Sequence, residues 1–354
     1  MIFDLDLQRS RLGEFDRQTL STAVSELLRA HRLGLHLVII RRELAQELSR
    51  TITLNEQDRA TLARVREQYT QTGGLLAHAN IFVRIGHYPH NTLRRIGDRI
   101  EMSLDGLLDT RILDRAALLL EDAISDGDLF KFMIRNIRDV LRCPPLNYDV
   151  VHGGGARTSD IFEHCLADRR IICVVVDTDA NAPSKARPAK IAELERRLLH
   201  SAWVGGVICP TPVREAENFL PLDLIANLPS ARHRGDTLDL FRRIGIQELG
   251  VGRNPADAHW LFFDIKEGCC KDRVDKLAVE DRAWIEASLT SAGIDVRSYS
   301  FLGFGENVLS QLFASNSLCS QFRTLIRHPD WMLLFRSFFA GFVWSFVANA
   351  RQAT

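Results

Sequence analysis

Carboxylate side chains follow three short apolar segments of the chain, and they are the residues whose types and spacing best suit chemistry. Clustered carboxylates repel one another unless a cation lies between them. Their oxygens suit Mg²⁺ or Mn²⁺ rather than zinc. The pattern therefore predicts a magnesium or manganese site made of Glu121 after residues 118–120, Asp177 and Asp179 after residues 171–176, and Glu215 and Glu217 after residues 204–209.

The apolar segments are short, largely β-branched and continuous rather than alternating, which is typical of strands buried on both faces of a parallel sheet. Residues 148–152 read as a further strand, and amphipathic stretches between the segments are long enough for crossover helices. The carboxyl ends of parallel strands share one edge, where open α/β folds bind ligands. We expect strands beginning near residues 116, 147, 171 and 204 to form one sheet, with Glu121, Asp177 and Asp179 at one edge.

The motifs follow one another in a fixed order: a strand with its glutamate, a glycine turn, a strand with Asp-x-Asp, and a further acid. This order resembles the Toprim domain of topoisomerases, primases and overcoming-lysogenization-defect nucleases. The tetrad from Glu215 to Asn218 (Glu-Ala-Glu-Asn) is more similar to the Toprim-type effectors of bacterial anti-phage systems. The resemblance covers roughly a third of the chain. It implies a Toprim-like, Rossmann-type parallel sheet and metal-dependent cleavage of phosphodiester bonds in DNA or RNA.

The resemblance also implies roles for individual residues. Asp177 and Asp179 would reach the cation, Glu217 or less favourably Glu215 would complete its ligands, and Glu121 would act as general acid/base or as a ligand. Asp126 is expected to support the ligands, to cap the following helix, or to do both. Two departures from the family stand out, because Asp122 replaces the usual glycine after the glutamate, and Ala180 and Asn181 displace the glycine usual after Asp-x-Asp.

Glycines and basic residues near the acids suggest how a phosphate would be bound, since phosphates dominate nucleic-acid affinity. Three glycines at a strand end allow the backbone to approach a phosphate closely, although a tight βα connection explains them equally. The basic residues predict a rim beside the acids, with a solvated helix face as the alternative. The residues concerned are Gly153, Gly154, Gly155, Lys185, Arg187, Lys190, Arg196, Arg197 and Arg214.

Composition limits the partners and the compartment. Among 354 residues, Lys+Arg and Asp+Glu both number 45, so a polyanion site must be a local patch. Seven scattered cysteines without a C-x-x-C motif indicate reduced thiols and a cytoplasmic protein. The N-terminus has no features of a signal peptide. The apolar run 331–349 contains Arg336, and we interpret it as a buried helix or a homo-oligomer interface rather than a membrane span.

We expect an α/β protein with three regions. Residues 1–110 form an N-terminal α/β piece without an assigned role, residues 111–225 form the Toprim-like metal-binding unit, and residues 226–354 are mainly helical. Within the last region, the apolar run 260–267 predicts a structural strand that ends in Asp264-x-Lys266, a weak echo of the acid and lysine pair of restriction nucleases.

The favoured function is that of a Mg²⁺-dependent endonuclease, a toxic effector of anti-phage defence with an ATPase or reverse transcriptase as its partner. One alternative is a non-catalytic, metal-binding scaffold or sensor subunit. Another is a phosphoacceptor switch built on Asp177, although a receiver would carry paired acids after its first strand and a lysine after its last. No tyrosine near the acids offers a topoisomerase nucleophile, and no zinc module supports a primase.

Overall fold

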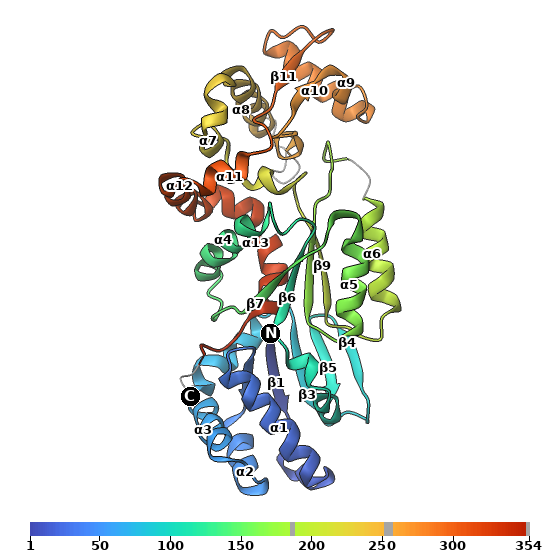
Figure 1. Ribbon diagram of the computed structural model, residues 1–354, viewed down its shortest axis with the longest axis vertical. Coiled ribbons are helices and arrows are strands. Elements are labelled where there is room, and N and C mark those ends of the chain that lie inside the picture. The colour runs from blue at the N-terminus through green and yellow to red at the C-terminus, as the bar shows by residue number, and fades with distance from the viewer. Residues whose placement is uncertain (185–187, 251–257, 352–354) are drawn as a thin grey trace.

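Two β-sheets, A and B, form the framework of the protein (Figure 1). The computed structural model describes residues 1–184, 188–250 and 258–351. Sheet A has the strand order β2-β1-β3-β5-β4, and all its neighbouring strands are parallel except β4, which is antiparallel to β5. Its strands are β1 (Ile2–Asp6), β2 (Leu37–Ile40), β3 (Phe82–Gly86), β4 (Leu93–Ile96) and β5 (Arg99–Ser103).

Helices α1 (Arg17–Arg32), α2 (Arg42–Thr51) and α3 (Glu56–Thr72) accompany sheet A. Side-chain caps define two of their starts, because Asp16 accepts a hydrogen bond from the Thr19 N–H and Asn55 accepts one from the Asp58 N–H. The predicted α/β character of the N-terminal part is therefore confirmed.

Sheet B contains four parallel strands in the order β7-β6-β8-β9, which confirms the sheet predicted from the apolar segments. Strands β6 and β8 are buried along their whole length, as their continuous apolar sequences require. Glu121 and Asp177 directly follow these two adjacent strands, so they lie at the same edge of the sheet. The strands are β6 (Ala116–Leu120), β7 (Tyr148–His152), β8 (Ile172–Val176) and β9 (Gly206–Pro210).

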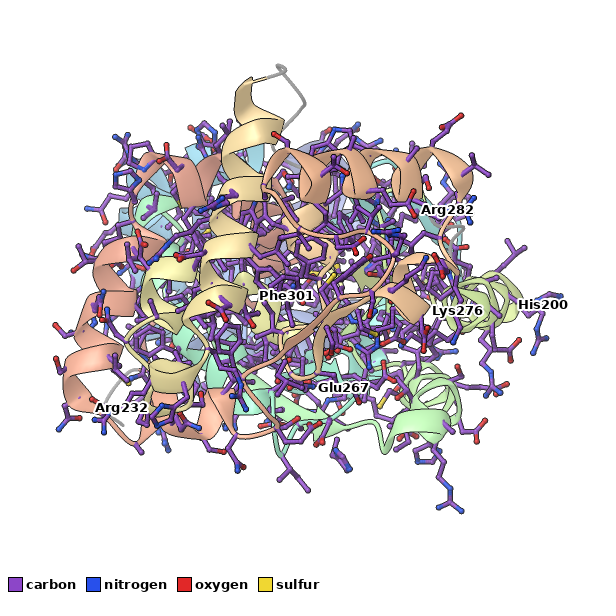
Figure 2. The ribbon with its side chains drawn as sticks, turned by 90° about the horizontal axis from the view of Figure 1, so that it is seen from above. His200, Arg232, Glu267, Lys276, Arg282 and Phe301 are labelled. Atoms are coloured by element: carbon purple, nitrogen blue, oxygen red, sulfur yellow. The ribbon has the colours of Figure 1, made fainter. Side chains whose placement is uncertain are left out.

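Helices cover both faces of sheet B (Figure 1). Helix α4 (Gly127–Val140) lies on one side together with α13 (Pro329–Val343), and α5 (Thr158–Ala167) and α6 (Ala189–His200) lie on the other. Seen from above, His200 at the end of α6 lies on the flank of the molecule away from Arg232 (Figure 2).

The C-terminal region is mainly helical, as expected. Its α-helices and strands, which follow α7 (Leu222–Ile225), are α8 (Gly235–Gly250), α9 (Lys271–Val274), α10 (Val279–Ser291), α11 (Val308–Phe313), α12 (Asn316–Ile326), α13 and the antiparallel pair β10 (Gly268–Cys270) and β11 (Ser300–Leu302).

The prediction of a strand over residues 260–267 is wrong. His259–Phe262 form a 3₁₀ helix, η9. The chain then turns, because the Asp264 carboxylate accepts a hydrogen bond from the Glu267 N–H and the Asp264 carbonyl accepts one from the Gly268 N–H. Extended structure begins only at β10.

One face of the C-terminal apolar run is buried in the protein, as predicted. Helix α13 buries Trp331, Phe335, Phe339 and Phe342, and the chain then returns toward the start of β7, where Val347 forms an antiparallel bridge with Leu146. Among the described residues, no helix combines the length and apolarity that crossing a bilayer requires. This segment of the C-terminal region therefore packs with sheet B rather than forming a unit apart.

Candidate functional site

Four segments bring carboxylates together at the carboxyl edge of sheet B. Glu121 follows β6, Asp126 precedes α4, Asp177 follows β8, and Glu217 lies on the 3₁₀ helix η6 (Ala216–Phe219) beyond β9. Burial raises the pKa of Asp177 well above its ordinary value, and the charges of Asp126, Glu121 and Glu217 raise it further. Among the described residues, none donates a hydrogen bond to the Asp177 carboxylate. The edge therefore holds negative charge that is only partly compensated.

Lys190, the second residue of α6, bridges two of the predicted ligands. Its Nζ donates to Glu121 Oε2 at 2.8 Å and to Asp179 Oδ2 at 2.7 Å. Although burial opposes its charge, the hydrogen bonds to Asp179 and Glu121 raise the pKa of Lys190. Asp179 has left-handed backbone geometry with φ 50°, and its N–H donates to the Arg214 carbonyl at 3.0 Å. The Lys190 ammonium thus stands where a cation would contact both carboxylates.

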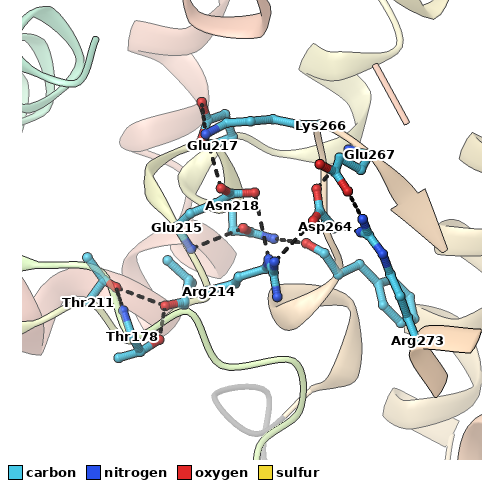
Figure 3. A network of polar contacts seen from close by, with 12 residues as sticks. Thr178, Thr211, Arg214, Glu215, Glu217, Asn218, Asp264, Lys266, Glu267 and Arg273 are labelled. Atoms are coloured by element: carbon cyan, nitrogen blue, oxygen red, sulfur yellow. Dashed lines mark hydrogen bonds and ion pairs between the residues drawn. The ribbon is translucent and has the colours of Figure 1, made fainter. Parts of the chain in front are cut away.

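A second lysine, Lys266, reaches two further predicted ligands from the C-terminal region (Figure 3). Its Nζ lies 3.1 Å from Glu215 Oε2 and 3.2 Å from Glu217 Oε1. Burial raises the pKa of Glu217 to about 7, and the charge of Lys266 opposes this rise. Burial also raises the pKa of Glu215. The other carboxylate oxygens, Glu215 Oε1 and Glu217 Oε2, are buried and accept no hydrogen bond from any described residue, although Arg214 Nε lies 3.8 Å from Glu215 Oε1.

Arg214 belongs to a network that fixes the segment after β9 against the C-terminal region (Figure 3). Its guanidinium lies 3.0 Å from Asp264 Oδ2, which also receives a hydrogen bond of 2.7 Å from Arg273. Asn218 donates to the Phe263 carbonyl at 2.9 Å and accepts from the Glu215 N–H at 3.3 Å. The network holds η6 in place, and it already engages the charge of Arg214.

Phe219 anchors the other end of η6 in the core. Its ring contacts the rings of Phe335 and Phe339 on α13 at centroid distances of 4.9 and 5.9 Å. Its carbonyl accepts a hydrogen bond of 2.9 Å from the Trp331 indole N–H. The position of Glu217 therefore depends on α13 as well as on β9.

The glycine turn after β7 holds the end of β6. The Gly153 N–H donates to the Leu120 carbonyl at 2.7 Å, and the Gly155 N–H donates to the Glu121 carbonyl at 3.1 Å. A Cβ atom at Gly153 would lie 2.8 Å from the Leu120 carbonyl oxygen, while Gly154 has φ +67° and Gly155 has φ +61°. Two of the three glycine amides thus fix the backbone at Leu120 and Glu121. This role of the glycines was not expected from the sequence.

The structure brings Lys190 to the acids, but neither Arg196 nor Arg197. These arginines follow Lys190 by six and seven residues, or roughly 9–10 Å along the helix axis. Arg196 forms a bidentate pair with Glu193, and Arg197 contacts Glu193, Glu163 and Asp160. Lys185 and Arg187, two further members of the expected rim, lie outside the described residues.

Asp126 occupies the N-cap position of α4, but its side chain makes no capping hydrogen bond. Its carboxylate instead accepts a bond of 2.8 Å from the Ser125 hydroxyl. The N-cap position is therefore as predicted, but the side chain does not cap the helix. Burial raises the pKa of Asp126 to about 6.

Sequence reasoning missed Lys266 as a member of the site. The Asp264-x-Lys266 spacing was the available signal, but the strand prediction for that segment gave the lysine no route to the acids.

The donor set suits a hard divalent cation because it consists of carboxylates, and among the described residues Glu215 Oε1 and Glu217 Oε2 are buried without a hydrogen-bond donor. Yet within the described ranges no group of three or more His, Cys, Asp or Glu side chains is gathered closely enough to hold a metal ion. The two lysines account for this spacing, since each ammonium separates a pair of carboxylates. Carboxylate ligands thus suit a divalent cation, but such a cation would contact both Glu121 and Asp179 only after the Lys190 ammonium has moved from between them.

Comparison of the chain with protein-family models, with curated proteins and with solved structures found no match.

Proposed function

We propose that the carboxyl edge of sheet B is the divalent-cation site of a nuclease that cleaves phosphodiester bonds. The observation that carries the proposal is the convergence of Glu121, Asp126 and Glu217 on Asp177, a carboxylate without a hydrogen-bond donor among the described residues. Strongly perturbed carboxylates in one cluster are typical of functional sites. The resemblance of the sequence to Toprim nucleases supports the same chemistry and is the basis for proposing a role in anti-phage defence.

In this proposal Glu121, Asp177 and Asp179 hold the cation. When bound, Mg²⁺ or Mn²⁺ supplies neutralisation of the phosphate and activation of a water molecule. Lys190 leaves its place between Glu121 and Asp179. From its position on α6 it remains within reach of an anionic substrate. Lys266 keeps Glu215 and Glu217 at the site by balancing their charge, and Gly153 and Gly155 keep the Glu121 backbone fixed.

The proposal is tested by incubating the purified protein with single- and double-stranded DNA and RNA in Mg²⁺ or Mn²⁺, with EDTA as the blank. The wild-type protein should cut at least one substrate, and Asp177→Asn and Glu121→Gln should lower the rate by at least ~10²-fold. Glu280→Gln, an exposed acid on α10, is the matched control and should cut like the wild type. Full activity in both site variants would refute the proposed site.

A non-catalytic scaffold is the second candidate, and the two lysine bridges favour it. Lys190 and Lys266 balance four carboxylates without any metal, so the cluster could serve only to join the C-terminal region to sheet B. In that case Mg²⁺ and Mn²⁺ would neither bind by calorimetry nor support cutting of any substrate. Binding of a cation without cutting would instead point to the metal-binding scaffold.

A further inference from the structure

Helix α4 presents basic side chains along its solvent-facing side. Lys131, Arg135 and Arg138 recur at intervals of four and three residues, so they lie on one stripe of the helix. Arg142 follows just after the helix ends. Lys131, Arg135 and Arg142 are exposed, and the Arg138 side chain is 40% exposed. The stripe begins beside the acids, because α4 starts at the residue after Asp126.

Helix α12 extends this basic stripe sideways. Phe132 of α4 stacks on Phe322 of α12, with ring centroids 5.4 Å apart and planes 6° apart. The Arg323 guanidinium lies over the Phe132 ring at 6.0 Å, and Arg327 lies 3.6 Å from Asp139 of α4. The two helices therefore carry their basic residues on one surface. This α4–α12 basic surface comprises Lys131, Arg135, Arg138, Arg142, Arg323 and Arg327.

The charge of the surface is only partly compensated, because Asp128 pairs with Lys131 and Asp139 pairs with Arg138 and Arg327. Asp128 and Asp139 are the acids of α4, and α12 has none. Across the described parts of the chain, no carboxylate forms an ion pair with Arg135, Arg142 or Arg323. On α6, by contrast, Arg196 and Arg197 are each engaged by acids of α5 or α6. A polyanion would thus find its free positive charge on the α4 side of sheet B.

We propose that the α4–α12 basic surface binds the phosphate backbone of a nucleic-acid strand and leads it to the acids at the edge of sheet B. The stripe from Lys131 to Arg138 spans roughly 10 Å of helix, and each strand of DNA carries a charge every ~3.4 Å of helix axis. The surface therefore faces several phosphates at once. A strand lying on it ends at Asp126 and its neighbours, which is why a nucleic acid suits the surface better than an anionic membrane. The direction of the strand rests on the proposed nuclease function.

The test measures binding in EDTA, so it requires neither metal nor cleavage. Fluorescein-labelled single strands and duplexes of DNA and RNA are titrated with protein, and anisotropy gives the affinity at salt concentrations from about 50 to 200 mM. The surface variant carries Arg135→Gln, Arg138→Gln and Arg323→Gln. The control carries Arg17→Gln, Arg50→Gln and Arg66→Gln, three exposed residues of the N-terminal helices, and has the same net charge. Circular dichroism and melting curves confirm that both variants are folded.

We expect the control to bind like the wild type and the surface variant to bind more weakly to every sequence. The slope of log K against log salt should become shallower by about 2 for the surface variant, since each lost phosphate contact contributes about 0.7–0.9. Equal slopes for the two variants would overturn the proposal, and so would a wild-type protein that binds none of the probes. Surface-dependent binding to phosphatidylserine vesicles without nucleic-acid binding would also overturn it, in favour of a membrane. Surface-dependent nucleic-acid binding by a protein that never cuts would refute the nuclease function and leave this surface standing.

Discussion

Nζ of Lys266 lies 3.2 Å from Oε1 of Glu217, and this contact joins the C-terminal region to the segment after β9. Glu217 is almost completely buried, whereas the Lys266 side chain is 26% exposed. The acidic edge of sheet B is therefore completed by a residue that does not belong to the sheet.

Replacing Lys266 with methionine should leave two buried carboxylates without their counter-ion. Breaking such a pair costs about 3–5 kcal/mol when it is fully buried, and the partial exposure of the lysine lowers the expected loss to about 2 kcal/mol. The loss should be larger at pH 8 than at pH 5, because at pH 5 Glu217 is protonated in both proteins. Urea unfolding at the two pH values measures it. Lys271→Met, which removes a surface partner of Asp275, should cost less than about 1 kcal/mol.

The stability of the metal-free protein should fall as the pH rises toward neutrality. Burial raises the pKa of Glu217 from 4.5 to about 7. Between these values the folded state keeps a proton that the unfolded state has released, so the unfolding free energy decreases with pH across this window and levels off above pH 7. Glu217→Gln should remove this part of the pH dependence, on the order of 1–3 kcal/mol. Unfolding curves from pH 4.5 to 8 in EDTA that match for wild type and variant would contradict the assignment.

Asp177→Asn should weaken metal binding without lowering the stability of the metal-free fold. In EDTA at pH 7.5 the variant should melt at the same temperature as the wild type or higher, because a neutral amide replaces a carboxyl group whose charged form is destabilised by burial. Mg²⁺ or Mn²⁺ at a hundred times its dissociation constant should stabilise the wild type by about 2.7 kcal/mol and the variant by much less. Asp128→Asn, which changes an exposed acid near the start of α4, should still be stabilised by Mg²⁺ or Mn²⁺ as the wild type is.

The turn at Gly153 should tolerate no side chain. A Cβ atom there would lie 2.5 Å from the Thr158 hydroxyl and 2.8 Å from the Leu120 carbonyl, so Gly153→Ala should cost about 1–3 kcal/mol and displace Glu121. Gly127→Ala at the start of α4 meets nothing closer than 4.0 Å and should be neutral or slightly stabilising. Thermal melts compare the two variants, and an unchanged Gly153→Ala protein would show that the turn can yield.

The sheet that carries the acids could be predicted from the sequence because its signal is local. The segments around β6 and β8 are continuously apolar and end in polar residues, and strands buried on both faces require that pattern. The same local reading placed Glu121 and Asp177 at one edge, since parallel strands share the direction in which they end.

The counter-charges could not be predicted, because they depend on contacts between distant segments. Lys266 reaches Glu217 only because the chain turns at Asp264 instead of continuing as a strand. Arg197 is engaged by Asp160 and Glu163 of the neighbouring helix, which no spacing along α6 reveals. The exposure of Arg135 likewise follows from which face of α4 packs on the core.

Because η6 depends on α13, the acidic edge cannot form at every stage of synthesis of the chain. Phe219 contacts Phe130 of α4, but its ring partners on α13 and the Trp331 indole are present only when residues 331–339 have been synthesised. A ribosome-bound chain from which sheet B but not α13 has emerged therefore lacks the α13 contacts of η6, although Phe130 and Lys266 already reach this segment. The acidic edge is therefore completed only after α13 has been synthesised and has docked beside η6.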